Sequence, residues 1–301
     1  MKNNIVSIKI LEEKVSKFID FYSDYKEDNN GEYIEFFAKY NDIAITLYHS
    51  KKGYKATFVG EKALYEAKIW DENAEIIKTK EKTKEEWLCL DYQIGSDEVG
   101  VGDFLLPMIV VAAFVKKEDI EELISLGIHD SKKMKDETIL CIGPTLIKKC
   151  LASKMLLTNE KYNEMILKGE NLNSLKARLH NQALKNVKNK VPQVRNIFID
   201  QFVKEETYYS YLKNDTPLYG ITFKTKGESY YPSVAVASVL ARYSFLIEKR
   251  KLEEKYGMEI PFGAGKKVDE FAKTFIDKFG KEEFDKIAKK NFANYSKAFE
   301  N

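Results

Sequence analysis

The chain has 301 residues, of which 44% are hydrophobic and 32% charged, a composition typical of a soluble globular protein with room for two domains. Lys and Arg number 49 against 47 Asp and Glu, so the formal net charge of +2 does not by itself indicate a polyanionic partner. Cys89, Cys141 and Cys150 form no zinc motif, which predicts reduced thiols in the cytoplasm. The N-terminus has no continuous apolar core like that of a signal peptide, and the longest apolar run, 104–115, is too short to cross a membrane.

The first 70 residues predict a small α+β domain. Segment 12–22 carries apolar residues at helical spacing. Segment 33–60 is rich in aromatic and β-branched residues and is interrupted by turn-forming pairs at 41–42 and 52–53, so it predicts three strands. Residues 62–70 predict a second helix. Helices on one face of such a sheet would leave its other face open.

A charged segment with few bulky side chains, 71–86, predicts a linker between this domain and the rest of the chain. It carries four alternating lysines, Lys78, Lys80, Lys82 and Lys84. The segment is either a solvated spacer or a basic arm that contacts phosphates, and the residues alone leave both open.

From residue 87 to 301 the pattern is that of an α/β domain. Two long strands, 88–100 and 104–115, flank a turn that contains glycines. The elements predicted after them are helices 117–127 and 130–150, strand 153–159, helix 172–191, strand 195–202 and helices 232–257, 266–280 and 282–299. Asp130 or Ser131 is expected to cap the second of these helices. Pro232 and Gly257 are expected to start and stop the longest one.

Four acidic residues are predicted at the ends of separate elements of this domain. Asp97 and Glu98 follow the first strand, Asp200 ends the strand "NIFID", and Glu228 precedes the longest helix. Carboxylates delivered to one rim suit two hard divalent cations, which can activate a water and stabilise a leaving oxygen in phosphodiester hydrolysis. Each acid taken singly is also compatible with a solvated turn or a helix cap, so spacing alone leaves a metal-dependent hydrolase as one of several possibilities.

The two adjacent acids pose a geometric problem. Neighbouring residues of a regular strand point to opposite faces, so Asp97 and Glu98 are expected to converge only if the strand bends or bulges there. Gly100 and Gly102 would permit such a bend and the close approach of a phosphate backbone.

Six segments of the chain closely resemble, in order and spacing, the signature segments of the bacterial ribonuclease HIII family, a type 2 ribonuclease H. They are "IGSDEVGVGDFLLPMIVVAAFV", "GIHDSKKM", "YNEMILKGENLNSLKARLHNQAL", "IFIDQF", "KGESYYPSVAVASVLARY" and "PFGAGKKVDEF". The likeness runs from about residue 90 to the C-terminus. The region before it resembles, more loosely, the family's N-terminal domain, a half-copy of the TATA-binding-protein fold that holds the substrate.

The resemblance implies a ribonuclease H-like mixed sheet flanked by helices, preceded by a small α+β TATA-binding-protein-like domain. It implies cleavage of the RNA strand of RNA/DNA hybrids by a monomeric enzyme, leaving 3′-hydroxyl and 5′-phosphate ends, with two Mg²⁺ or Mn²⁺ ions. By resemblance, Asp97, Glu98, Asp200 and Glu228 are the catalytic and metal-binding acids. The ions would activate a water and stabilise the departing 3′ oxygen, with Glu228 helping to hold one ion or its water.

The segment Gly100-Val101-Gly102 departs from the family pattern, which usually has threonine between the glycines. The backbone amides that would contact ribose and phosphate remain, while a hydroxyl contact from residue 101 is lost. Two alternatives stay open: cleavage at single ribonucleotides embedded in DNA, as in the related ribonuclease HII family, and a hybrid-binding protein without catalysis.

Further candidates for substrate contacts are basic residues in or beside the matched segments: Lys132, Lys133, Lys176, Arg178, Lys224 and Lys226. His129 and His180 invite a general-base role, but His180 lies on an amphipathic helix where a structural role is expected. Arg242 and Tyr243 are expected to pack. In the first domain an aromatic and basic sheet face is predicted to meet the hybrid, although the pattern does not decide which face is open. Its candidates are Tyr33, Phe36, Lys39, Tyr48 and Lys55.

Overall fold

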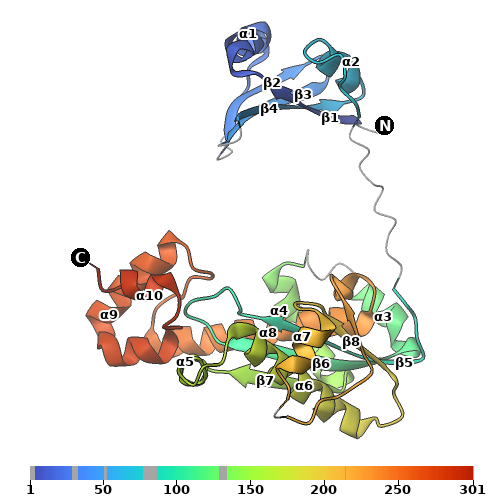
Figure 1. Ribbon diagram of the computed structural model, residues 1–301, viewed down its shortest axis with the longest axis vertical. Coiled ribbons are helices and arrows are strands. Elements are labelled where there is room, and N and C mark those ends of the chain that lie inside the picture. Colours follow the sequence, from blue (N-terminus) through green and yellow to red (C-terminus); the bar gives the residue numbers. More distant parts are fainter. Residues whose placement is uncertain are drawn as a thin grey trace. The chain divides into compact units, whose positions relative to one another are not determined.

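The computed structural model describes residues 4–28, 33–50, 53–76, 87–128, 134–213 and 215–300. Contacts divide the chain into two compact units, Met1–Lys84 and Glu85–Asn301, each of which is described by itself. Together they show the expected fold class, a small α+β unit followed by a mixed sheet flanked by helices (Figure 1). None of the helices in the described part of the chain has the length and apolar character needed to cross a membrane.

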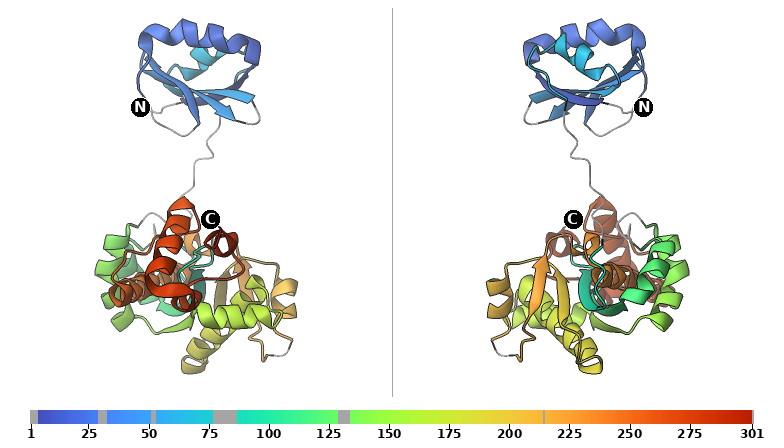
Figure 2. Two further views of the ribbon diagram at one scale, coloured as in Figure 1. Left: turned by 90° about the vertical axis from the view of Figure 1, so that its left-hand side faces the viewer. Right: turned by 90° about the vertical axis from the view of Figure 1, so that its right-hand side faces the viewer.

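The first unit contains an antiparallel sheet with strand order β1-β4-β3-β2. Its elements are β1 (Asn4–Ile10), α1 (Glu12–Tyr22), the short 3₁₀ helix η1 (Ser23–Tyr25), β2 (Ile34–Tyr40), β3 (Ile43–Ser50), β4 (Gly53–Gly60) and α2 (Ala63–Lys68). Both α-helices cover the same face of the sheet, where Phe18 of α1 and Ala67 of α2 join the apolar core (Figure 2). Among the described residues of this unit, no helix covers the opposite face.

Two features of this unit differ from the sequence-based expectation. The first described element is strand β1, which the sequence pattern did not predict and which pairs with β4 along its length. The predicted linker also begins too early, because residues 71–76 pack on the first unit: Ala74 is buried and Ile76 bridges to Val6. The lysines of the proposed basic arm lie outside the described residues.

The second unit contains a mixed sheet with strand order β7-β6-β5-β8-β9. The strands are β5 (Tyr92–Val99), β6 (Met108–Lys116), β7 (Ala152–Leu157), β8 (Asn196–Asp200) and β9 (Ile221–Lys224). The first three are antiparallel neighbours, whereas β8 runs parallel to both β5 and β9. The carboxyl ends of β5, β8 and β9 therefore meet at the same edge of the sheet.

Helices cover both faces of this sheet. On one face α8 packs against β5 and β6, and Ile139 of α4 joins the same core as Val111 of β6. On the other face Ala183 of α6 packs with Val110 of β6. The helices of the unit are η2 (Lys117–Asp119), α3 (Ile120–Ser125), α4 (Asp136–Lys149), α5 (Asn159–Leu167), α6 (Leu172–Lys190), α7 (Glu205–Ser210), η4 (Gly227–Ser229), α8 (Pro232–Tyr256), α9 (Lys266–Ile287) and α10 (Ala293–Lys297).

Helix boundaries agree with the sequence at α8, which starts with Pro232 and stops at Gly257, where φ is +61°. Two other predictions are wrong. Helix α4 begins at Asp136, several residues after the expected cap, and the candidates Asp130 and Ser131 lie outside the described residues. The single helix predicted over 282–299 is broken: α9 kinks at Gly280 and ends at Ile287, and α10 begins only at Ala293.

Candidate active site

The four predicted acids gather near one edge of the second sheet. Asp97 and Glu98 stand at the end of β5, and Asp200 ends the parallel neighbour β8. The Gly227 backbone N–H donates a hydrogen bond to Asp200 Oδ1 at 2.9 Å, which holds the start of η4 against the end of β8. Glu228, the next residue, is buried. The topology thus brings together acids that are more than a hundred residues apart in the chain.

The bend expected at the two adjacent acids is not seen there. Strand β5 pairs with β6 without a register shift, with Asp97 opposite Val111 and Glu98 opposite Val110. The two side chains therefore lie on opposite faces of the strand, as regular alternation requires. Asp97 faces α8 and Glu98 faces α6. The chain turns only at Gly100, where φ is +83°.

Asp97 is held by α8 in a buried setting, with 7% of the residue exposed. Its Oδ1 accepts the Glu98 backbone N–H at 2.7 Å, and the Ser238 hydroxyl of α8 also donates to the carboxylate. Helix α8 can approach β5 this closely because residue 95 is glycine: a Cβ at Gly95 would lie 2.4 Å from the backbone N of Val234.

Burial, together with the negative charges of Glu98 and Asp200, raises the pKa of Asp97 to about 8. The hydrogen bonds from Ser238 and from the Glu98 backbone act in the opposite direction but do not cancel these effects. Asp97 and Asp200 are thus close enough to repel each other in a poorly solvated place. A cation bound between them would relieve that repulsion.

Glu98 has the opposite environment. Its carboxylate forms an ion pair with Lys176 of α6 and accepts a hydrogen bond from His180 Nε2 at 2.9 Å. Burial would raise the pKa of Glu98, but the hydrogen bonds and charges of His180 and Lys176 outweigh it and hold the pKa below its usual value. His180 is in turn oriented by Ser96, whose Oγ lies 2.8 Å from Nδ1.

Phe202 covers these two partners of Glu98. The Lys176 ammonium lies 3.9 Å from the centre of the Phe202 ring, and the His180 ring stacks on the same side chain with centroids 5.3 Å apart. Lys176 was a candidate for phosphate contact; in the structure its side chain is buried, with 8% exposed, and its ammonium pairs with Glu98. His180, for which a structural role was expected, is fully buried.

The donor set suits a hard divalent cation, because carboxylate oxygens are the ligands that Mg²⁺ and Mn²⁺ prefer. In the described ranges, no group of three or more His, Cys, Asp or Glu side chains is already arranged to hold a metal ion. The alternation along β5 explains this, since Asp97 and Glu98 point to different faces and Glu98 is engaged by Lys176. Asp97 and Asp200 are the pair that fits an ion most directly.

Comparison with known proteins decides the family. The curated ribonuclease HIII of Bacillus cereus (strain AH187) is 41% identical over 276 residues, which cover 88% of each chain. The chain belongs to the ribonuclease HIII family. The ribonuclease HIII of Bacillus thuringiensis subsp. konkukian (strain 97-27) has the same identity and coverage. The ribonuclease HII family model matches residues 94–295, and a model described only as a domain of unknown function matches residues 4–84.

Solved structures agree with this assignment. The crystal structure of Bst-RNase HIII in complex with Mn²⁺ superimposes with a TM-score of 0.68 at 32% identity, covering 99% of this chain and 98% of that one. Aquifex aeolicus RNase H3, at 23% identity and a TM-score of 0.55, supports the fold alone. As a member of the ribonuclease HIII family, the chain is a ribonuclease H.

The glycine segment of this ribonuclease HIII forms a turn directly after β5. A Cβ at Gly100 would lie 2.1 Å from the carbonyl oxygen of Pro107, so the turn packs tightly on its inner side. Gly102 is exposed, with open space around its Cβ position. Val101, the departure from the family pattern, packs its side chain partly against the cluster that contains Met108 and Tyr162.

The remaining basic candidates of the catalytic unit differ in how available they are. Lys224 and Lys226 are exposed beside Glu228, and Lys224 Nζ lies 4.5 Å from the centre of the Tyr230 ring. Arg178 is tied to Glu170 at 2.7 Å and to Asp215 at 3.1 Å. Lys132, Lys133 and His129 lie outside the described residues.

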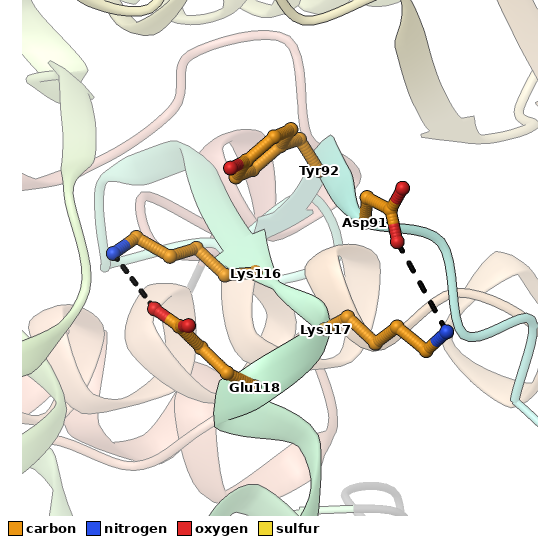
Figure 3. A pocket seen from close by; sticks show the side chains of 5 residues that line it. All are labelled: Asp91, Tyr92, Lys116, Lys117 and Glu118. Atoms are coloured by element: carbon orange, nitrogen blue, oxygen red, sulfur yellow. Dashed lines mark hydrogen bonds and ion pairs between the residues drawn. The ribbon is translucent and has the colours of Figure 1, made fainter.

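A hollow lies near each end of β5. One, of about 330 Å³, lies beside the acids and is lined by residues that include Glu98, Ser238 and Arg242. Arg242 there makes two hydrogen bonds to Asp136, at 2.9 and 2.8 Å, in keeping with its expected packing role. The other, of about 370 Å³, lies at the opposite end of β5, and its lysines pair with acids of the same hollow (Figure 3). Its lining residues are Asp91, Tyr92, Lys116, Lys117 and Glu118.

In the first unit the structure decides which face of the sheet is open. Phe36 is 4% exposed and belongs to the core beneath the helices, so its predicted place on the open face is wrong. Lys39, Tyr48 and Lys55 alternate with buried neighbours and lie on the open face, and Tyr33 is exposed just before β2. Lys9 was not among the candidates because strand β1 was not predicted. In the sheet Lys9 lies opposite Lys55 of β4, and Lys55 lies opposite Tyr48 of β3.

Proposed function

We propose that this ribonuclease HIII hydrolyses the RNA strand of RNA/DNA hybrids, leaving 3′-hydroxyl and 5′-phosphate ends, with two Mg²⁺ or Mn²⁺ ions. The observation that carries the proposal is the meeting of Asp97 and Asp200 at the ends of parallel strands, where burial and mutual repulsion raise the pKa of Asp97. Such a site favours cations, and the similar Bst-RNase HIII has been crystallised with Mn²⁺.

In this proposal Asp97, Glu98 and Asp200 hold the metal ions, and Glu228 helps to hold one ion or its water. When bound, the ions supply an activated water and stabilise the departing 3′ oxygen. Asp97 is oriented by Ser238, and Asp200 is fixed by the Gly227 backbone. Because these side chains are positioned before the substrate arrives, little reorganisation is needed during the reaction.

Substrate contacts are proposed on both units of a monomeric, cytoplasmic enzyme. In the catalytic unit they involve the glycine turn and the exposed Lys224 and Lys226. In the first unit they involve the open sheet face, and we liken this unit to half of a TATA-binding-protein fold. Aromatic and basic side chains on a sheet suit nucleic acid, since rings can stack on bases or sugars while ammonium groups neutralise phosphates.

The test compares wild-type protein with Asp97→Asn and Asp200→Asn, assayed with Mg²⁺ or Mn²⁺ on a long RNA/DNA hybrid. Each substitution is expected to reduce cleavage by about a thousandfold or more while hybrid binding persists, because a carboxylate is lost without change of shape. Asp91→Asn, an exposed change at the other end of β5, is the matched control and should retain activity.

Three results would contradict the proposal. Near wild-type cleavage by either variant would show that the site lies elsewhere. Wild-type cleavage of a DNA duplex containing one ribonucleotide, with little cleavage of the long hybrid, would favour the ribonuclease HII-like alternative. If the wild-type protein bound the hybrid but showed no metal-dependent cleavage, meaning no cleavage that a chelator abolishes, a non-catalytic role would be favoured.

A further inference from the structure

A lysine far from the acids in sequence is buried beneath the glycine turn. Lys289 follows α9 and is 1% exposed, which places it among the largest fully buried side chains of the described chain. Its Nζ donates hydrogen bonds to the carbonyl oxygens of Gly100, at 2.5 Å, and Asp103, at 2.6 Å. A buried ammonium is costly unless it is well bonded, so the two carbonyls and the cation stabilise one another.

Aromatic rings complete the surroundings of this ammonium. It lies 5.6 Å from the ring centres of both Tyr162 and Phe292, within the range of cation–π attraction. Burial lowers the pKa of Lys289 to about 8, and the charge of Asp103 only partly offsets this effect. A neutral amine would still carry two N–H groups, so both carbonyls can be satisfied in either protonation state.

The backbone that carries Lys289 is itself anchored. Asn159 and Asn163 of α5 donate their side-chain N–H groups to the carbonyl oxygens of Ile287, at 2.5 Å, and Ala288, at 2.8 Å. The Lys290 backbone N–H donates back to Asn163 Oδ1 at 2.9 Å. These bonds explain why the chain leaves helical geometry after Ile287, and they fix the point from which Lys289 reaches the turn.

A second segment grips the other end of the turn. The Gly263 backbone N–H donates to Asp103 Oδ1 at 2.6 Å, and the Phe104 N–H donates to the Gly263 carbonyl oxygen at 3.0 Å. The inner side of the turn is thus bonded to two C-terminal segments. On the outer side, the backbone N–H groups of Val101 and Gly102 make no hydrogen bond within the described part of the chain.

We propose that Lys289 is a positioning residue for substrate binding: it fixes the turn of residues 100–103 so that the N–H groups of Val101 and Gly102 are presented to the nucleic-acid strand beside the acids. The inference rests on the proposed function, because it assumes a nucleic-acid substrate. It assigns Lys289 no contact with the reacting atoms. Two backbone donors in fixed positions suit a phosphate or ribose oxygen. They contribute more to the binding free energy when the turn is already ordered, because no conformational entropy is then lost on binding.

The test compares wild type with Lys289→Met, which keeps the length and apolar stem of the side chain and removes the donors. The matched control is Lys290→Met, the same change one residue along, where the side chain is exposed, pairs with Asp285 and lies 5.8 Å from the centre of the Tyr295 ring. Steady-state kinetics on the hybrid, at a temperature where all proteins are folded, should show KM raised about tenfold in Lys289→Met with kcat changed less than about threefold. Lys290→Met should match wild type.

A purely structural role for Lys289 predicts a different result. Loosening of the whole unit would lower kcat and Mn²⁺ affinity together, whereas the proposal expects Mn²⁺ affinity without substrate to stay within about twofold of wild type, since the acids remain held by α6 and α8. Backbone hydrogen exchange should rise in residues 100–104 and stay unchanged in β5. A wild-type KM for folded Lys289→Met, or parallel losses of kcat and Mn²⁺ binding, would overturn the proposal.

If Lys289→Met does not fold, the KM of Lys289→Gln provides the test. Its amide is one atom shorter and reaches at most one of the two carbonyls, so KM should rise at least about threefold. A wild-type KM for this variant would overturn the proposal. Failure of the proposed function is distinguishable, because wild-type protein would then not cleave the hybrid at all.

Discussion

His180 Nε2 lies 2.9 Å from Glu98 Oε2, so the second acid of the adjacent pair is held by a side chain from the helix on the far face of the sheet. Together with Lys176 it gives Glu98 a cationic neighbourhood, whereas Asp97 on the other face is crowded by acids. Adjacent residues of one strand thus have pKa values shifted in opposite directions. In the proposed metal site, an ion bound by Glu98 would compete with Lys176 for the carboxylate.

That competition predicts the effect of Lys176→Met on metal affinity. Removing the ammonium leaves the acids with one more uncompensated negative charge, so Mn²⁺ should bind about three- to tenfold more tightly in the absence of substrate. Calorimetric titration of Mn²⁺ near neutral pH would measure it. Lys190→Met, at the far end of α6, is the control and should leave affinity unchanged. Weaker binding in Lys176→Met would mean that the lysine orients Glu98 for the metal.

The raised pKa of Asp97 predicts how stability depends on pH in metal-free protein. Between the unfolded pKa of 3.8 and the folded value of about 8, the native state binds more protons than the unfolded chain, so stability falls as pH rises through this window. Asp97→Asn removes that loss. With a chelator present, its melting temperature should exceed that of wild type by about 3–8 °C at pH 9 and by little at pH 4. Equal melting temperatures for wild type and Asp97→Asn at pH 9 would contradict the raised pKa that burial and the neighbouring acids give Asp97.

The open face of the first sheet predicts an effect of charge reversal on binding. Lys9→Glu combined with Lys55→Glu should weaken hybrid binding about tenfold or more. The slope of log affinity against log salt concentration should become shallower by the equivalent of about one to two phosphate contacts. The control combines Lys14→Glu and Lys68→Glu on the helical side of the same unit, with the same change in net charge. Equal losses in both double variants would indicate long-range attraction and not contact by the sheet face.

Gly100 and Gly102 predict contrasting effects on stability. Alanine at residue 100 would combine a φ of +83° with a Cβ 2.1 Å from the Pro107 carbonyl oxygen, so unfolding free energy should fall by about 2 kcal/mol or more. Alanine at residue 102 meets open space and should change it by less than about 0.5 kcal/mol. Denaturant unfolding followed by circular dichroism would measure both. A stable Gly100→Ala protein would show that the turn can shift.

The sequence pattern could place Asp97, Glu98 and Asp200 at strand ends and Glu228 ahead of α8, whereas their proposed role as metal ligands rests on the resemblance to the ribonuclease HIII family. Strands β5, β6, β7 and β8, the long helices α4, α6 and α8, and the limits of α8 were also predictable, whereas β9, α5 and α7 were not predicted. Features set by distant contacts were not. The covering of Phe36 depends on which side the helices pack, and the burial of Lys176 depends on the position of Glu98. The burial of Lys289 could not be predicted, because residues 282–299 have a helical pattern. In the structure the side chains of Asn159 and Asn163 bond to the backbone at Ile287 and Ala288, where the helix ends.

The absent side chain of Gly95 has a consequence for how the enzyme tolerates change. Since α8 touches the β5 backbone at Val234, the hydroxyl one helical turn later meets Asp97, two residues further along the strand. A methyl group at residue 95 would act as a wedge, tilting a 25-residue helix and withdrawing Ser238 from the acid. Activity is therefore vulnerable at a position that carries no functional group, and random mutagenesis should find inactive but folded variants there.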